Sequence, residues 1–448
     1  MAETDATPTQ GWRALIAGAD QHERVALLWS FLFFFCQLFG YYILRSVRES
    51  LIAADGARLL PTVFTSVFIC MLALMPLYGA LVARVQRRHF MPAVYVIVIG
   101  SLIAFSMLLD RSMSTQTATA FAIFLTVINL FTDSVFWSFM ADIFVSNQAK
   151  RFYAIIAAGG TAGAILGPLA TRFLVAHVEV SGLMLISAAF YTLCFGCLLR
   201  LIPWARKQEL RSGRPDGDQL IGGSIIAGAK VVFRKPALIA LMLHMFFGVS
   251  IGTFIYNAQA QTVGAMNLSS VDRTQYFAMI DLAMNVSVLL IQVLVTRTLL
   301  IRFGVGPLLL IPAIAAGLGM GSIALAQGAM MLAAVQVGTR GLSFSFVKPA
   351  RETLFTLVDR EARYKAKNFI DTVVYRGSDM VTSWSFYALG AIGLGIAGKA
   401  GVWFGVALVW LVVVIWLIRI TRTMRDQRQV EESQVETGNP VIAERATP

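Results

Sequence analysis

Long apolar segments recur along the whole chain and constrain its fold more than any other feature. A helix needs about 20 apolar residues to cross the hydrocarbon core of a bilayer. Only 14% of the 448 residues are charged, whereas a soluble domain has about 25%, and the mean hydropathy is +0.71. About twelve segments satisfy this length criterion, near residues 25–45, 58–83, 90–109, 120–144, 152–176, 181–203, 236–260, 274–297, 303–326, 329–357, 367–395 and 400–420. The sequence therefore predicts an all-α membrane protein with twelve transmembrane helices.

Basic residues collect in alternate loops, and this pattern predicts the orientation of the chain. Lys and Arg are concentrated in loops on the cytoplasmic side of a membrane. The basic clusters follow the even-numbered apolar segments, while the other loops are short and poorer in charge. Both termini are therefore predicted to be cytoplasmic, in a multi-pass protein of the bacterial inner membrane. The net charge of +12 is explained by these loops, so no nucleic-acid partner is predicted.

A polar stretch divides the chain near its middle. Residues 204–219 are rich in Arg, Lys, Gly, Pro and Asp, and the stretch that follows is short and amphipathic. Such a stretch is typical of a helix that lies on the membrane surface. The predicted parts are a cytoplasmic tail at 1–24, a six-helix bundle at 25–203, a linker with an interfacial helix at 204–235, a second six-helix bundle at 236–421 and a cytoplasmic tail at 422–448.

The two halves resemble each other in sequence. Residues 149–152 read AKRF and are followed by Gly160-Thr161, and residues 366–369 read AKNF and are followed by Gly377-Ser378. Parallel repeats of six spans are the plan of the major facilitator transporters, whose substrate site lies near the membrane midplane. The loop at residues 79–88, GALVARVQRR, also resembles the signature loop of that superfamily, with Ala83 in place of its acidic residue and Gln86 in place of its second glycine. These resemblances imply two six-helix bundles in a major-facilitator-type arrangement.

The chain contains none of the common catalytic motifs. It has no G-x-x-x-x-G-K-[ST], H-E-x-x-H or G-x-S-x-G sequence, and its four histidines are scattered. All four cysteines fall inside apolar segments, where packing accounts for them, including the pair Cys194 and Cys197. We therefore predict no enzyme activity, no metal site and no cofactor. The expected protein is a monomeric secondary transporter, with a small-molecule substrate and membrane lipid as its partners.

Charged residues inside the predicted spans are the candidates for substrate binding. An ionisable side chain at membrane depth is costly and is interpreted by default as functional. Arg45 and Arg48 are three residues apart, on one helical face at the predicted end of the first span. The predicted substrate-binding residues are Arg45, Arg48, Arg340, Lys348, Arg351, Asn129, Trp137, Tyr256 and Asn257. The residues predicted to balance charge or to couple protons are Glu49, Asp133, Asp281, Glu352, Asp371 and Asp379.

The excess of positive charge in this set predicts the chemistry of the substrate. Guanidinium groups bind phosphate or carboxylate groups through paired hydrogen bonds. The substrate is therefore predicted to be an organic or phosphorylated anion.

Three alternatives remain open. The charges could neutralise one another locally, in the pairs Arg376–Asp379, Arg48–Glu49 and Arg351–Glu352. The chain could instead export drugs or other small molecules with protons, or act on lipid as a membrane-embedded enzyme or scaffold.

Four motifs resemble the nucleotide transporters of plastids and intracellular bacteria, the ATP/ADP translocase type. They are YILRSVRE at residues 42–49, FWSF at 136–139 followed by AKRFY at 149–153, FVKPARE at 346–352 and KAKNFID at 365–371. They occur in both halves and in the family's order. The chain departs from the family at Leu125, where nucleotide exchangers carry an acidic residue, and at Arg351, which replaces a lysine. The resemblance implies a nucleotide or a related phosphate compound as substrate, moved by ATP:ADP-type antiport or a similar exchange.

Overall fold

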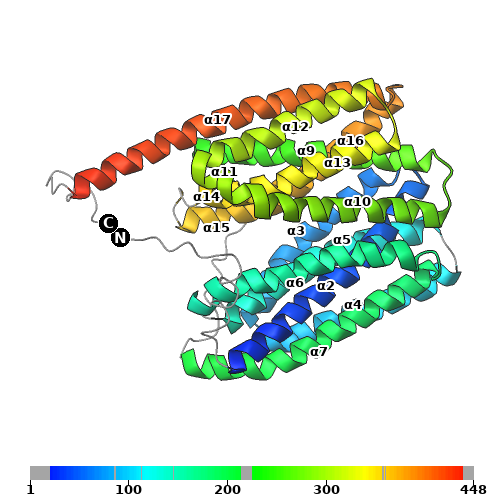
Figure 1. Ribbon diagram of the computed structural model, residues 1–448, viewed down its shortest axis with the longest axis horizontal. Helices are drawn as coiled ribbons and strands as arrows, with labels where there is room; N and C mark the ends of the chain where they lie inside the picture. The colour runs from blue at the N-terminus through cyan, green and yellow to red at the C-terminus, as the bar shows by residue number, and fades with distance from the viewer. Residues whose placement is uncertain are drawn as a thin grey trace. The chain divides into compact units, whose positions relative to one another are not determined.

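The computed structural model shows a helical protein (Figure 1) and describes residues 21–84, 87–111, 114–144, 146–212, 225–355, 358 and 360–436. No strand occurs among these residues. In the first half of the chain the helices are α2 (Gln21–Ala54), α3 (Leu60–Arg84), α4 (Arg87–Arg111), α5 (Thr115–Ile143), α6 (Ser146–Leu174) and α7 (Val180–Ser212). In the second half they are α8 (Ile225–Arg234), α9 (Pro236–Gly264), α10 (Ser270–Ile291), α11 (Arg297–Phe303), α12 (Val305–Leu325), α13 (Ala329–Leu342), α14 (Lys348–Phe355), α15 (Arg360–Phe369), α16 (Tyr375–Ala391) and α17 (Ile396–Glu436).

The helices confirm the predicted fold class. Within the described residues, ten are long and apolar enough to cross a membrane. The other two of the twelve predicted segments are α3, whose apolar part covers Leu60–Leu74, and the segment that runs from α15 to α16. The described residues thus form an all-α membrane protein, in which ten of the twelve predicted segments are long and apolar enough to span. The helix predicted in the linker is also present, as α8, and its position on the membrane surface stays a prediction.

Three short π-helical turns interrupt the spans of the second half. They are η1 (Gln292–Thr296) after α10, η2 (Ser343–Val347) between α13 and α14, and η3 (Ile370–Val374) between α15 and α16. A single π turn inside an α-helix changes the local hydrogen bonding and is frequent at functional sites. The Thr296 hydroxyl of η1 donates to the Ser345 carbonyl of η2 at 3.3 Å. The Thr296 side chain therefore supplies a hydrogen bond to a backbone carbonyl of η2.

The chain forms two compact units. The N-terminal unit comprises Met1–Leu220 and Gln259–Val286, and the C-terminal unit comprises Ile221–Ala258 and Ser287–Pro448. The last residues of α9 and most of α10 therefore pack with the N-terminal unit, although they follow the linker in the sequence. This placement brings the middle of α10 next to α2.

The N-terminal unit is built around α2, which packs against α6 and α7 (Figure 1). Glycines on α6 allow a close approach, because a Cβ added at Gly163 would meet the backbone of Phe35, and one at Gly167 would lie 2.9 Å from the Phe39 carbonyl. On the other side, the Ser187 hydroxyl of α7 donates to the Gly40 carbonyl of α2 at 2.9 Å. Small residues in this spacing let transmembrane helices pack backbone to backbone, so α2 is held on two sides.

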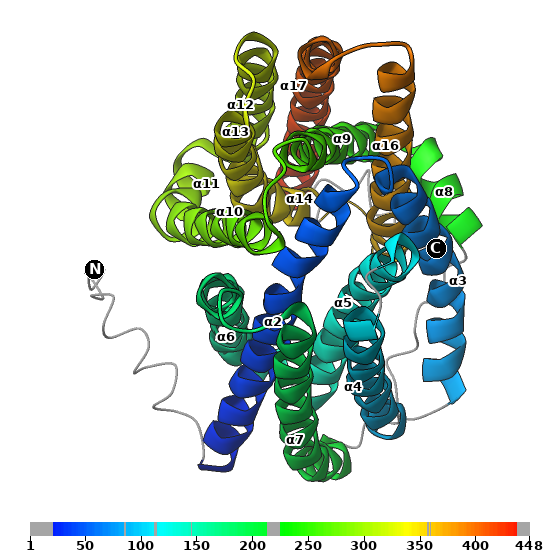
Figure 2. The ribbon, with the colours of Figure 1, turned by 90° about the vertical axis from the view of Figure 1, so that its right-hand side faces the viewer.

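The C-terminal unit joins α9 and α16 by hydrogen bonds between side chains. The Thr382 hydroxyl donates to Ser250 Oγ at 2.8 Å, and Asn257 Nδ2 donates to Ser383 Oγ at 3.0 Å. The long α17 packs beside α12 in the same unit (Figure 2). Hydrogen bonds between transmembrane helices stabilise their association, and here they bury a row of polar groups within the unit.

Candidate functional site

Helix α2 continues past the arginines that were predicted to end the first span. It runs to Ala54, so Arg45, Arg48 and Glu49 lie inside the helix. Arg48 is 9% exposed and Glu49 is 5% exposed. The helix therefore extends beyond the predicted end of the span near residue 45, and the point at which it leaves the membrane stays a prediction. Opposite charges meet within this segment, and their pairing lowers the cost of keeping them in a buried helix.

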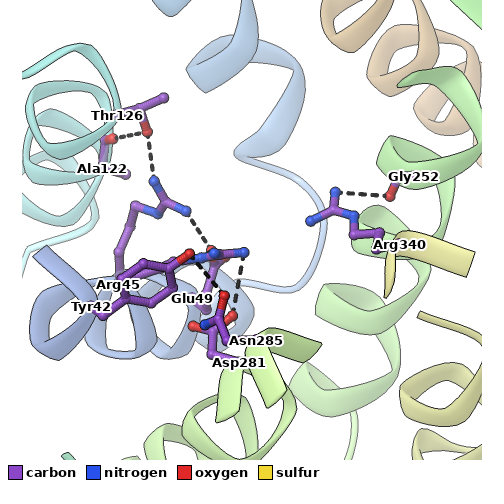
Figure 3. A network of polar contacts seen from close by, with 10 residues as sticks. Tyr42, Arg45, Glu49, Ala122, Thr126, Gly252, Asp281, Asn285 and Arg340 are labelled. Atoms are coloured by element: carbon purple, nitrogen blue, oxygen red, sulfur yellow. Dashed lines mark hydrogen bonds and ion pairs between the residues drawn. The ribbon is translucent and has the colours of Figure 1, made fainter. Parts of the chain in front are cut away.

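The charges of α2 form a buried ion-pair cluster in the N-terminal unit (Figure 3). Arg48 Nη2 lies 2.5 Å from Glu49 Oε1, and Arg45 Nε lies 3.8 Å from the same oxygen. Arg45 Nη2 also lies 3.3 Å from Asp281 Oδ1 on α10. The local pairing of Arg48 with Glu49 was one of the alternatives left open by the sequence. Two cations thus meet two carboxylates, and the cluster is neutral overall.

Neutral side chains surround this cluster, on α2 and α10 themselves and on one further helix, α5 (Figure 3). Thr126 Oγ1 on α5 accepts a hydrogen bond from Arg48 Nη1 at 2.9 Å and donates its own proton to the Ala122 carbonyl at 2.7 Å. The Tyr42 hydroxyl donates to Asn285 Oδ1 at 3.3 Å. Sequence reasoning missed Thr126, Tyr42 and Asn285 as site residues. Position 126 lies one helical turn before the predicted Asn129, and this spacing was the available signal.

The predicted residues of α5 have polar contacts in one case and aromatic contacts in another. Asp133 Oδ1 accepts a hydrogen bond from Gln37 Nε2 at 2.9 Å, and Gln37 Oε1 accepts one from the Tyr95 hydroxyl at 2.5 Å. Trp137 packs edge-on against aromatic rings, with Tyr153 at a centroid distance of 5.4 Å. Asn129 Oδ1 is buried without a hydrogen-bond partner among the described residues. Asp133 and Trp137 are thus part of the packed interior of the unit.

Arg340 in the C-terminal unit lies in a different environment. Its Nη2 donates a hydrogen bond to the Gly252 carbonyl of α9 at 3.2 Å (Figure 3). Nearby, Asp379 of α16 is 5% exposed. Arg376 Nη1 lies 2.9 Å from Asp379 Oδ2, and the Thr253 hydroxyl donates to Asp379 Oδ1 at 2.6 Å. The pair Arg376–Asp379, proposed from the sequence as a local neutralisation, is therefore present.

The charges that follow η2 pair differently from the sequence-based alternative. Arg351 Nη1 lies 2.5 Å from Asp371 Oδ1, and Lys367 Nζ lies 2.7 Å from Glu352 Oε1. The local pair Arg351–Glu352 is thus replaced by two pairs that join α14 to the α15–η3 segment. Lys348 is exposed.

Two predicted residues lie on α9 and complete the set. Asn257 is fully buried, with its Nδ2 bonded to Ser383 and to the Thr253 carbonyl. Its Oδ1 has no hydrogen-bond partner within the described part of the chain. Tyr256, the next residue toward the helix start, is partly buried. Most of the predicted residues therefore lie in separate polar clusters within each unit, whereas Trp137 packs against aromatic rings and Lys348 is exposed.

The fold and these buried charges define a polytopic helical membrane protein of the transporter class. The family model "Major Facilitator Superfamily" matches residues 30–366. The chain therefore belongs to the Major Facilitator Superfamily and is a secondary transporter of that type. Among curated proteins, no match to the chain is found.

Solved structures share the fold over most of the chain. The nucleoside transporter NupG matches with a TM-score of 0.60 and 16% identity, over 89% of this chain and 99% of its own. A POT family transporter in complex with a thioalcohol-conjugated peptide matches with a TM-score of 0.61 and 12% identity, over 89% and 96%. The human organic anion transporter MFSD10 (TETRAN) matches with a TM-score of 0.57 and 15% identity, over 88% and 99%. At these identities the likeness concerns the fold alone.

Proposed function

We propose that this chain transports an organic or phosphorylated anion by alternating access, with nucleotides as the first candidates. The observation that carries this proposal is the presence of arginines inside apolar spans, where Arg48 of α2 is buried and Arg45 of α2 and Arg340 of α13 are partly buried. Charged side chains at membrane depth are retained where they serve a substrate or ion pathway. Guanidinium groups favour phosphate and carboxylate ligands because their planar donors match those anions.

Two further observations support a nucleotide or a related compound. The four motifs in both halves resemble the ATP/ADP translocase type of nucleotide transporter. NupG, which shares the fold, is a nucleoside transporter, and MFSD10 is an organic anion transporter. The proposed location is a bacterial inner membrane. Both termini are proposed to lie in the cytoplasm, because basic residues are concentrated in alternate loops.

The proposed roles follow the chemistry of the side chains. The anion is bound by cationic and neutral polar groups: Arg45, Arg48, Arg340, Lys348, Arg351, Asn129, Trp137, Tyr256 and Asn257. Carboxylates balance the cations or exchange protons: Glu49, Asp133, Asp281, Glu352, Asp371 and Asp379. Contacts support a charge-balancing role for Glu49 and Asp281, because both pair with Arg45.

Uptake into proteoliposomes tests the proposal. Purified protein is reconstituted, and uptake of labelled ATP, ADP and glucose 6-phosphate is measured with and without an internal exchange partner. Arg45→Ala and Arg48→Ala are expected to reduce uptake about tenfold or more, because each removes charge-assisted hydrogen bonds. Arg200→Ala is the matched control, since Arg200 is exposed on α7 and lies over the Trp29 ring. Uptake that is equal in all variants would refute the assigned roles, provided that each variant elutes as a monodisperse protein.

A second candidate function is proton-coupled export of drugs or other small molecules. Two carboxylates within the spans favour it: Asp281 is 3% exposed, and Asp133 is partly buried and accepts a hydrogen bond from Gln37. This function requires Asp133 or Asp281 for transport and does not require the arginines. Dye efflux from cells that express the protein separates the two functions. Efflux that is lost in Asp133→Asn and retained in Arg48→Lys would favour the exporter.

A further inference from the structure

The candidate arginines differ in whether a carboxylate already neutralises them. Arg45 and Arg48 pair with Glu49 and Asp281, and Arg351 pairs with Asp371. A guanidinium that already faces a carboxylate must exchange that partner, or share it, before it binds a second anion. Electrostatic attraction for an incoming anion is therefore weakest where the local charge is balanced.

Arg340 has no such partner among the described residues. Its hydrogen bond goes to the neutral Gly252 carbonyl, and both oxygens of the neighbouring Asp379 are taken by Arg376 and Thr253. The two arginines and one carboxylate leave one net positive charge in this part of the C-terminal unit. A guanidinium has five N–H donors, and one hydrogen bond leaves Arg340 enough for a paired interaction with an oxyanion.

Lys348, the other predicted cation without an acidic partner in the described residues, is a weaker candidate. It is exposed, and a hydrated ammonium attracts an anion less than a partly buried guanidinium does. Arg340 is partly buried within the span formed by Ala329–Phe355. An uncompensated charge in that position is unfavourable, so an anionic ligand stabilises the site by supplying the missing charge.

The glycine at position 252 makes this arrangement possible. A Cβ added there would lie 3.3 Å from Arg340 Nε and 3.5 Å from Nη2. With hydrogen at this position, the guanidinium packs directly on the backbone of α9 and reaches the carbonyl. The carbonyl fixes the orientation of the guanidinium and leaves its positive charge uncompensated. A carboxylate in the same place would neutralise that charge.

We propose that Arg340 receives the negative charge of the transported anion and that Gly252 positions its guanidinium for this role. The inference rests on the proposed function and makes it more specific. The substrate presents a phosphate or carboxylate group to the C-terminal unit, and Arg340 binds it there. The neutral cluster around Arg45 and Arg48 contributes oriented hydrogen bonds and less net charge.

Ligand-dependent stability of the purified protein tests this inference. Melting temperature is titrated with ATP, ADP and glucose 6-phosphate as probes, since a ligand that binds the folded state raises it by mass action. Arg340→Gln is expected to weaken the apparent affinity about 100-fold, and Arg340→Lys, which keeps the charge but loses the planar donors, about tenfold. Gly252→Ala is expected to weaken it about threefold to tenfold, because it displaces the guanidinium.

The matched control for the glycine is Gly338→Ala, on the same helix as Arg340, where an added Cβ meets no atom within 4 Å. The matched control for the charge is Arg302→Gln, which is exposed on α11. Both are expected to bind the probes as the wild type does. In uptake assays Gly252→Ala raises KM while the maximal rate and the melting temperature without ligand stay near wild type, a pattern that loss of packing would not give.

The possible outcomes separate the two proposals. If the probes stabilise the wild type and Arg340→Gln or Arg340→Lys equally, the inference is wrong and the proposed function stands. If Gly252→Ala binds like Gly338→Ala, the positioning role is wrong. If no probe stabilises the wild type or is taken up, the proposed function fails and the inference fails with it. Should Arg340→Gln not fold, the lysine and glycine variants still decide the result.

Discussion

The first and fifth spans of each half pack together in both units, but by different chemistry. In the N-terminal unit, α2 and α6 approach through glycines, so that the Phe35 carbonyl would contact any Cβ at Gly163. In the C-terminal unit, α9 and α16 are joined by hydrogen bonds such as that from Asn257 to Ser383. Steric fit is sensitive to one methyl group, whereas a single hydrogen bond between transmembrane helices contributes little.

The units also differ in their charges. The cluster around Arg45 is balanced by carboxylates, whereas Arg340 and Arg376 share the neighbourhood of one carboxylate, Asp379. A balanced cluster attracts an incoming anion less strongly than a surplus positive charge does. A repeated fold therefore need not have equivalent functions in its two halves.

The largest expected effect on stability comes from breaking the balanced cluster. Arg45→Gln leaves Glu49 and Asp281 with less compensating charge in a buried site, and we expect a loss of about 3–5 kcal/mol in the free energy of unfolding. The double variant Arg45→Gln with Asp281→Asn removes both charges of a pair and is expected to recover most of this loss. Thermal unfolding in detergent measures both. A double variant that is as unstable as the sum of Arg45→Gln and Asp281→Asn alone would contradict a balanced ion pair.

An intermediate effect is expected from the glycine contact. Gly163→Ala places a methyl group against the backbone of α2, which cannot move aside as a side chain can, and is expected to cost about 1–3 kcal/mol. Gly196→Ala on α7 is the control, since no atom lies within 4 Å of its added Cβ. The melting temperatures of the two variants are compared with that of the wild type. Equal values for both would show that α2 and α6 are not in tight contact.

The smallest effect is expected from one polar contact of the C-terminal unit. Ser383→Ala removes the acceptor for Asn257 Nδ2 and is expected to cost about 0.6–1.7 kcal/mol. Ser385→Ala, whose hydroxyl bonds the Val381 carbonyl of its own helix, is the control. A loss at Ser383 as large as that at Gly163 would remove the contrast between the two interfaces.

Much of the fold could be predicted from hydropathy, because each span needs about 20 apolar residues to cross the hydrocarbon core, whichever helices pack against it. The first span was predicted to end near residue 45, whereas helix α2 extends to Ala54. A prediction from local hydropathy ends a span where arginines occur. It cannot recognise that Asp281, more than 200 positions away, supplies a partner for Arg45.

The candidate site was predictable in part. Charged residues at membrane depth were found because charge is rare there, and the pairs Arg48–Glu49 and Arg376–Asp379 are close in sequence. Thr126 and Asn285 were missed because an uncharged polar residue in a span has no distinctive pattern. Which acid faces which base, as in Arg351 with Asp371, depends on helix packing and could not be inferred from spacing.

The sequence by itself determined that this chain crosses a membrane about twelve times in two related halves. Hydropathy and repeated motifs depend only on residues that are close together in the sequence. Only the tertiary structure decided how the buried charges are distributed. Arg45 is neutralised by a residue on α10, whereas Arg340 rests on the backbone carbonyl of Gly252. The physical reason is that the interaction between two charges depends on their separation in space and on the groups around them, which helix packing sets.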